Sequence, residues 1–205
     1  IDANVSVASI GEKYINAIGG RDKVNKINSL TSTATSTVQG MALEMTIIQA
    51  KGGKSLMDIK MMGNTIQKIV FDGKEGYMMA QGQKMPLPAE AKAEAKQQIF
   101  PELDFATSKT IKLKGIENIN GEDAYTLKDG NTTYYYSVAS GLKLGELKTQ
   151  KQGEQEMKIP TYFSDYKEVN GVKHPFKMTQ SMGGMEIVFD FKSYEVNKAT
   201  DKDFQ

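Results

Sequence analysis

The chain has 205 residues, with 26 Lys and Arg against 25 Asp and Glu, one His and no Cys. A formal net charge of +1 supplies no field that would hold nucleic acid, so we expect no nucleic-acid partner. The absence of Cys excludes disulfides, thiol chemistry and Cys-based zinc sites. A chain of this length can bury a substantial core, and we therefore expect residues 1–205 to form a single domain.

The amino-terminal segment, residues 1–27, has the pattern of a helical region. Apolar residues recur at a spacing of three and four and would share one helix face: Val7, Ile10, Tyr14 and Ile18. Either Ser6 or Ser9 can cap the helix, and Ser9 with Glu12 has the spacing of a capping box. Gly19-Gly20 then favours termination.

From residue 28 onward, alternating apolar and polar residues replace the helical period. Turn dipeptides such as Asp72-Gly73, Asn120-Gly121 and Asn170-Gly171 recur along the chain, and such dipeptides accept the positive φ values of tight hairpins. The pattern predicts a mainly β, α+β protein with about eleven antiparallel strands. Two strand meanders are expected, over residues 28–87 and 108–196.

A segment rich in strong helix formers, residues 88–100, separates the two meanders. Ala91, Ala95 and Ile99 form its thin apolar stripe. We interpret the segment as a short helix laid across the sheet as a lid. A solvated connector between the meanders is the alternative.

The first meander carries an unusual set of apolar side chains. Alternation predicts that eight of them share the dry face of the strands and line a cavity: Leu43, Met45, Ile47, Met57, Ile59, Met61, Tyr77 and Met79. Methionine is flexible and polarizable, which suits an adaptable binding surface as well as an irregular core. The pattern leaves both interpretations open, a hydrophobic ligand cavity and a core filled by the protein's own helices.

Catalytic and metal-binding motifs are not found in the sequence. His174 is the single histidine, so neither a His-Glu-x-x-His zinc motif nor its inverted form can be present. No Gly-x-Ser-x-Gly elbow presents a nucleophile, and the carboxylate pair Glu122-Asp123 adjoins a hairpin turn. We therefore expect no enzyme activity in this segment, no catalytic residue, no metal and no cofactor.

Several segments together resemble a known family. They are residues 14–20 (YINAIGG), 39–41 (QGM), 70–77 (VFDGKEGY), 116–125 (IENINGEDAY), 135–142 (YYSVASGL) and 165–176 (DYKEVNGVKHPF). The sequence resembles the outer-membrane lipoprotein-sorting-protein-like domains, which are similar to the carriers LolA and LolB. It looks most like the domain that follows the peptidase halves in some insulinase-type zinc peptidase chains of Gram-negative bacteria.

The resemblance implies a half-open antiparallel β-barrel wrapped around an N-terminal helix and a mid-chain helix, with a hydrophobic cavity. It implies a periplasmic or outer-membrane setting and a non-catalytic module that holds a lipid, an acyl chain or a lipoprotein. The alternative is an accessory domain whose barrel is self-filled and whose partner is a peptidase domain or another envelope protein. The resemblance transfers no catalytic residue to this chain.

Overall fold

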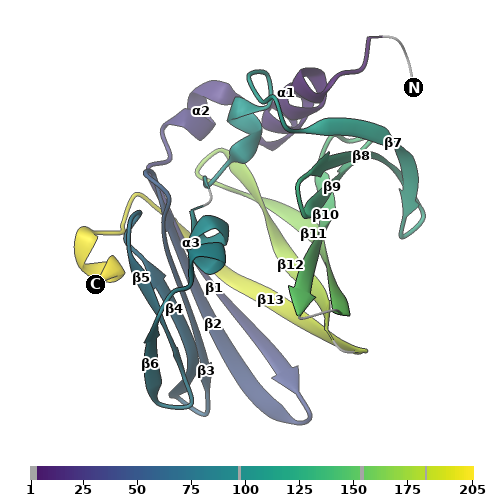
Figure 1. Cartoon of the computed structure of the whole chain (residues 1–205). Coiled ribbons are helices and arrows are strands. Elements are labelled where there is room, and N and C mark those ends of the chain that lie inside the picture. Colours follow the sequence, from purple (N-terminus) through teal and green to yellow (C-terminus); the bar gives the residue numbers. More distant parts are fainter. Residues whose placement is uncertain (1–3, 97, 153–154, 183) are drawn as a thin grey trace. The chain divides into compact units, whose positions relative to one another are not determined.

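The computed structural model describes residues 4–96, 98–152, 155–182 and 184–205. The protein is mainly β, as expected, and its strands form one antiparallel sheet with the order β6-β5-β4-β3-β2-β1-β13-β12-β11-β10-β9-β8-β7 (Figure 1). The sheet has 13 strands where the sequence indicated about eleven. Strands β5 and β6 have only five and four residues, too few for alternation to identify each of them securely.

The elements have the following bounds. The helices are α1 (Val7–Ile18), α2 (Arg21–Asn25), α3 (Ala89–Ala95) and the 3₁₀ helices η1 (Pro101–Asp104) and η2 (Asp201–Phe204). The first strands are β1 (Ser29–Val38), β2 (Met41–Ala50), β3 (Lys54–Met61), β4 (Asn64–Phe71), β5 (Gly76–Ala80) and β6 (Gln83–Pro86). The later strands are β7 (Lys112–Ile119), β8 (Glu122–Asp129), β9 (Thr132–Ser137), β10 (Lys143–Gln152), β11 (Gln155–Val169), β12 (Val172–Met182) and β13 (Met185–Val196).

The chain folds into two compact units. The first unit combines Ile1–Val24 with Glu102–Val188, and the second combines Asn25–Pro101 with Phe189–Gln205. The first therefore contains α1 and β7 to β12, and the second contains β1 to β6, α3, most of β13 and η2.

Helix α1 packs against β12 in the first unit. Its N-cap is Ser6, whose side-chain oxygen accepts a hydrogen bond from the Ser9 backbone N–H. The Ser9 side-chain oxygen in turn accepts one from the Ser6 backbone N–H. The capping box thus joins Ser6 to Ser9, and the pairing of Ser9 with Glu12 that the sequence suggested is wrong. At the other end, Gly19 has a φ of 142°, and a Cβ there would lie 2.3 Å from the Gly171 carbonyl oxygen. Only glycine allows this close approach of helix end and hairpin.

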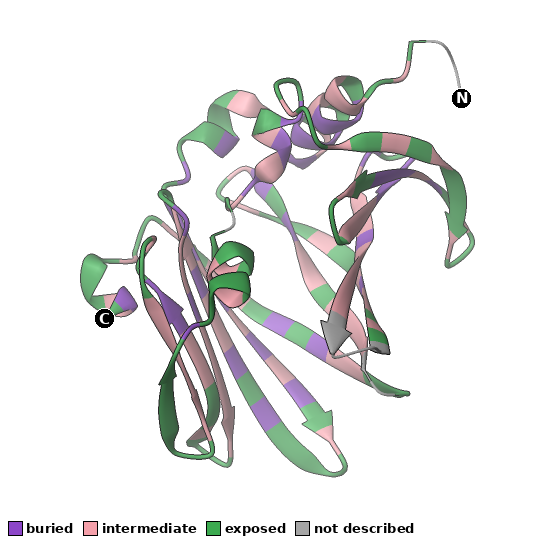
Figure 2. Cartoon of the chain, viewed as in Figure 1, coloured by how far each residue is buried: buried purple, intermediate pink, exposed green. Residues whose placement is uncertain are grey.

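The sheet of the second unit has two apolar faces rather than one. The face that we call the C-terminal face carries Ile48, Leu56 and Val70, which form a buried cluster with Phe204 of η2. The other face carries most of the methionines and is described below. Figure 2 shows buried positions alternating with less buried ones along β1, which is the period expected of a strand.

Helix α3 lies against the face that carries most of the methionines. The Ser55 hydroxyl donates a hydrogen bond of 3.2 Å to the Ala95 carbonyl oxygen, and Ser55 lies opposite Phe71. Lys92 of α3 also pairs with Glu75. Of the described residues in the segment predicted over 88–100, the seven residues Ala89–Ala95 are helical, and none of these seven is fully buried.

Candidate functional site

Six of the predicted cavity residues share one face of the second unit's sheet, which we call the methionine face. Residues directly opposite each other on antiparallel strands point to the same side. The register places three such pairs between β2 and β3: Leu43 opposite Met61, Met45 opposite Ile59, and Ile47 opposite Met57. Leu43 and Met45 are buried, and the other four are half-buried.

The methionine face continues across β4, β5 and β6. Ile69 lies opposite Met57, Met78 opposite Ile69, and Met85 opposite Met78. Met85 is 43% exposed, which indicates that the apolar surface reaches solvent toward the β6 edge. The sequence analysis did not single out Ile69, Met78 and Met85. Alternation within each strand, combined with the register between neighbouring strands, is the signal that would have found them.

Tyr77 and Met79 do not belong to this face, contrary to the sequence-based grouping. Tyr77 lies opposite Val70, and its ring packs against the cluster on the C-terminal face. Its hydroxyl donates to the Gln205 carbonyl oxygen at 3.2 Å. The sequence-based grouping of Tyr77 and Met79 with the methionine face failed because the register of β5 was not known. A register shift of one residue turns every side chain of a strand to the other face, and the turn before β5 sets its register.

The predicted lid residues Ala91, Ala95 and Ile99 are all half-buried. On either side of them the chain is fixed by buried side chains, Leu87 at 5% exposure and Phe100 at 7%. The intervening segment is thus tied down at both ends and has few buried contacts between them. A lid role for this segment remains a prediction.

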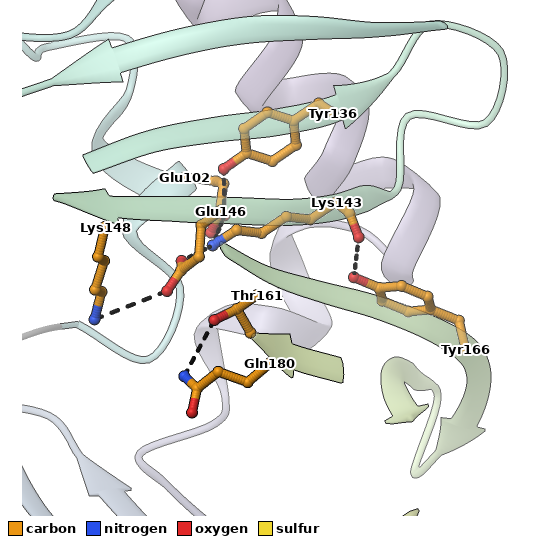
Figure 3. Close-up of polar contacts among 8 residues, drawn as sticks. All are labelled: Glu102, Tyr136, Lys143, Glu146, Lys148, Thr161, Tyr166 and Gln180. Atoms are coloured by element: carbon orange, nitrogen blue, oxygen red, sulfur yellow. Dashed lines mark hydrogen bonds and ion pairs between the residues drawn. The ribbon is translucent and has the colours of Figure 1, made fainter. Parts of the chain in front are cut away.

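A cluster of charged side chains lies on one face of the first unit's sheet (Figure 3). We call Glu102, Lys143, Glu146 and Lys148 the ion cluster. The Lys143 Nζ lies 3.1 Å from Glu146 Oε2 and 3.9 Å from Glu102 Oε1, and Lys148 Nζ lies 3.8 Å from Glu146 Oε1. The side chains of Glu102 and Lys143 are only 2% and 13% exposed.

Aromatic side chains and a tyrosine hydroxyl complete the surroundings of the cluster. The Tyr136 hydroxyl donates a hydrogen bond of 2.7 Å to Glu102 Oε1. The Lys143 ammonium lies 4.7 Å from the centre of the Tyr134 ring and 5.7 Å from that of Phe163. These distances allow a cation–π contribution in a site withdrawn from water.

The electrostatics of the cluster follow from burial opposed by opposite charges. Burial is the largest influence on Lys143 and works to lower its pKa, but the carboxylates of Glu146 and Glu102 outweigh it and raise the pKa. Burial likewise works to raise the pKa of Glu146, and Lys143 with Lys148 reverses this and lowers it. Burial raises the pKa of Tyr136 well above its ordinary value. Lys143 and Glu146 are therefore both charged at neutral pH, while Tyr136 keeps its proton.

A bulge in β10 explains why the sequence did not reveal the cluster. Residues three apart on a regular strand point to opposite faces, so Lys143 and Glu146 would normally be separated. The β9–β10 register shifts between Lys143 and Gly145, which places Lys143 opposite Tyr136 and Glu146 opposite Tyr134. Both charges then lie on the same face as the tyrosines.

His174 has no place in the ion cluster and is buried at 3% exposure in β12. Burial lowers the pKa of His174 to about 4, so the ring is neutral at pH 7. Among the residues that the structure describes, no group of His, Cys, Asp and Glu could hold a metal ion. The described helices also include none that is long and apolar enough to cross a membrane.

Comparison with solved structures finds chains of similar fold, including the following two. A LolA-superfamily protein from Nitrosomonas europaea is 14% identical with a TM-score of 0.64, over 98% of both chains. A DUF1329-family protein from Desulfovibrio piger is also 14% identical, with a TM-score of 0.61 over 97% of both chains. The chain has the LolA-like fold. No protein-family model and no curated protein matches the sequence, so the assignment rests on structure.

The LolA-like fold confirms the fold class that the sequence predicted. At 14% identity the two neighbours show the arrangement of the backbone and nothing about ligands. The binding properties of this LolA-like chain must therefore be argued from its own methionine face and ion cluster.

Proposed function

We propose that this LolA-like chain is a non-catalytic binding module of the bacterial envelope that holds a lipid, an acyl chain or a lipid-modified protein. The methionine face carries the proposal. Its six paired side chains from Leu43 to Met61 form a continuous apolar surface, and Met85 extends it to a position 43% exposed. An apolar surface with many flexible methionines accommodates chains of varied length and saturation.

The position of α3 supports access of a ligand to this surface. The helix contacts the methionine face near Ser55, at the opposite end of β3 from Met61. Its contacts include the hydrogen bond from Ser55 and the Lys92–Glu75 pair, and it buries none of its own residues fully. An exposed ion pair contributes about 0–1 kcal/mol, so the Lys92–Glu75 pair adds little free energy to the attachment of the helix.

Native mass spectrometry of the chain purified from a Gram-negative periplasm, followed by organic extraction, tests the proposal. A co-purifying species of lipid mass that is released on unfolding is the expected result. A clean ligand-free mass, together with no binding of a fluorescent fatty acid, would overturn it. That result would favour the accessory-domain alternative, in which α3 and the flanking Leu87 and Phe100 fill the surface and the partner is a peptidase or another envelope protein.

Matched substitutions identify the binding surface. Met61 is half-buried on the methionine face, whereas its neighbour Met62 is 82% exposed in the β3–β4 turn. Met61→Asp and Met57→Asp place a charge on the apolar surface and should abolish retention of the fatty acid. Met62→Asp should leave retention unchanged. Equal retention in folded Met61→Asp, Met57→Asp and Met62→Asp variants would show that the ligand binds elsewhere.

A further inference from the structure

The ion cluster has hydrogen-bonding capacity that its own members do not use. A charge-assisted N–H···O bond spans about 2.7–2.9 Å. The contacts of Lys143 with Glu102 at 3.9 Å and of Lys148 with Glu146 at 3.8 Å exceed this distance, and only the Lys143–Glu146 contact at 3.1 Å approaches it. The Lys148 side chain is 33% exposed and can meet a ligand, whereas Glu146, at 17% exposure, is only partly accessible.

Neutral polar groups continue from the cluster across two further strands. Glu146 of β10 lies opposite Thr161 of β11, and Thr161 lies opposite Gln180 of β12. The Gln180 side-chain N–H donates to the Thr161 hydroxyl at 3.2 Å, as Figure 3 shows. This bond uses neither the hydroxyl proton of Thr161, which is buried at 6% exposure, nor the amide oxygen of Gln180. The row therefore places a donor and an acceptor beside the partly exposed Lys148 and the more buried Glu146.

Charge balance defines the ligand that this row accepts. The formal charges of the two lysines and two glutamates of the cluster sum to zero, and the pKa directions keep Lys143 and Glu146 charged. An anion alone or a cation alone would leave a net charge in a site largely withdrawn from water, which is costly. A group that carries both charges a few ångströms apart leaves the sum at zero.

We propose that the ion cluster with Thr161 and Gln180 binds a zwitterionic group of the phosphoethanolamine type. The phosphate oxygens accept from Lys148 and from the Thr161 hydroxyl, and the ammonium donates to Glu146 and to the Gln180 amide oxygen. The group can be the head of a lipid or a free small molecule. The lipid source rests on the function proposed above, whereas the site itself rests only on the first unit.

Backbone amide shifts of the labelled full chain, titrated with three soluble probes, test the site. Glycerophosphoethanolamine should shift the amides of Lys148, Thr161 and Gln180 saturably. Glycerophosphate, which supplies only negative charge, and ethanolamine, which supplies only positive charge, should each bind at least about tenfold more weakly. Equal shifts with all three probes, or none with glycerophosphoethanolamine at the solubility limit, would overturn the proposal.

Lys148→Gln is the informative variant because the lysine is partly exposed and its loss leaves the Lys143–Glu146 pair intact. Its affinity for glycerophosphoethanolamine should fall about 10- to 100-fold, the range for one charge-assisted bond. Lys167→Gln is the matched control, since Lys167 pairs with Asp165 at 3.0 Å on the solvent-exposed part of β11. Unchanged affinity in a folded Lys148→Gln chain would overturn the assignment.

A short-chain diacyl phosphoethanolamine separates the two sources. Binding tighter than glycerophosphoethanolamine supports a lipid head group. Equal binding of the two probes supports a free small molecule and contradicts the lipid-binding function while the site stands.

Discussion

The Lys143 ammonium lies 3.1 Å from the Glu146 carboxylate, and both side chains are largely withdrawn from solvent. The two residues are three apart on one strand and meet only because β10 is bulged between them. Removal of one partner from a buried pair leaves an uncompensated charge, which costs far more than the intact pair contributes. The contact therefore makes the first unit sensitive to single substitutions at this point.

Lys143→Met should lower the free energy of unfolding by about 3–5 kcal/mol, because Glu146 and Glu102 would lose their most buried cationic neighbour. Urea unfolding followed by circular dichroism measures the change. Lys148→Met is the control, since Lys148 is 33% exposed and an exposed pair contributes about 0–1 kcal/mol. Similar small losses in both variants would contradict the tight coupling of Lys143 to its carboxylates.

Tyr136→Phe should destabilise the protein by about 1–3 kcal/mol, because Glu102 is 3% exposed and would lose its hydroxyl donor. Tyr135→Phe is the control. Tyr135 points to the opposite face of β9, away from Glu102. The loss of its hydroxyl should therefore destabilise the protein less than the loss of the Tyr136 hydroxyl. The two midpoints of thermal unfolding, measured in one buffer, decide between a specific bond and a general effect of losing an oxygen.

Stability should fall as the pH is lowered from about 6.5 to about 4, in part through His174. The unfolded chain binds a proton at the ordinary histidine pKa, whereas burial lowers the folded-state pKa to about 4. The unfolded state therefore binds more protons in this window, and acid favours it by up to about 3 kcal/mol in total.

The comparison with His174→Gln isolates this contribution. The wild type should lose more stability than the variant between pH 7 and pH 4.5, in denaturant titrations at each pH. Parallel losses in the two proteins would contradict a depressed His174 pKa, as would imidazole resonances that titrate near pH 6.5.

Gly76→Ala should destabilise the second unit by about 1–3 kcal/mol through overpacking. An added Cβ would lie 2.3 Å from the Val70 carbonyl oxygen and 2.7 Å from Leu87 Cδ1. Gly115→Ala is the matched control, because no atom lies within 4 Å of its added Cβ and its φ is not positive. The control should be neutral or slightly stabilising, since alanine restricts the unfolded chain. Equal urea midpoints for the two variants would contradict the close approach at Gly76.

The sequence determined the elements whose signal is local. The three- and four-residue spacing from Val7 to Ile18 predicted α1, and the alternation from Leu43 to Met61 predicted both strands and their shared face. Turn dipeptides such as Asn120-Gly121 predicted where hairpins reverse, because residues near them need positive φ values. These signals depend on neighbours in the chain and need no knowledge of distant contacts.

Tertiary structure alone decided which side chains meet across strands. The register of β5 turned Tyr77 and Met79 to the C-terminal face, and the bulge in β10 brought Lys143 to Glu146. Glu102 joined this pair from a 3₁₀ helix 41 positions before Lys143. Register and bulges are set by pairing between segments far apart in sequence, and a shift of one residue reverses every side chain. The apolar surface could therefore be predicted in large part, whereas the ion cluster could not.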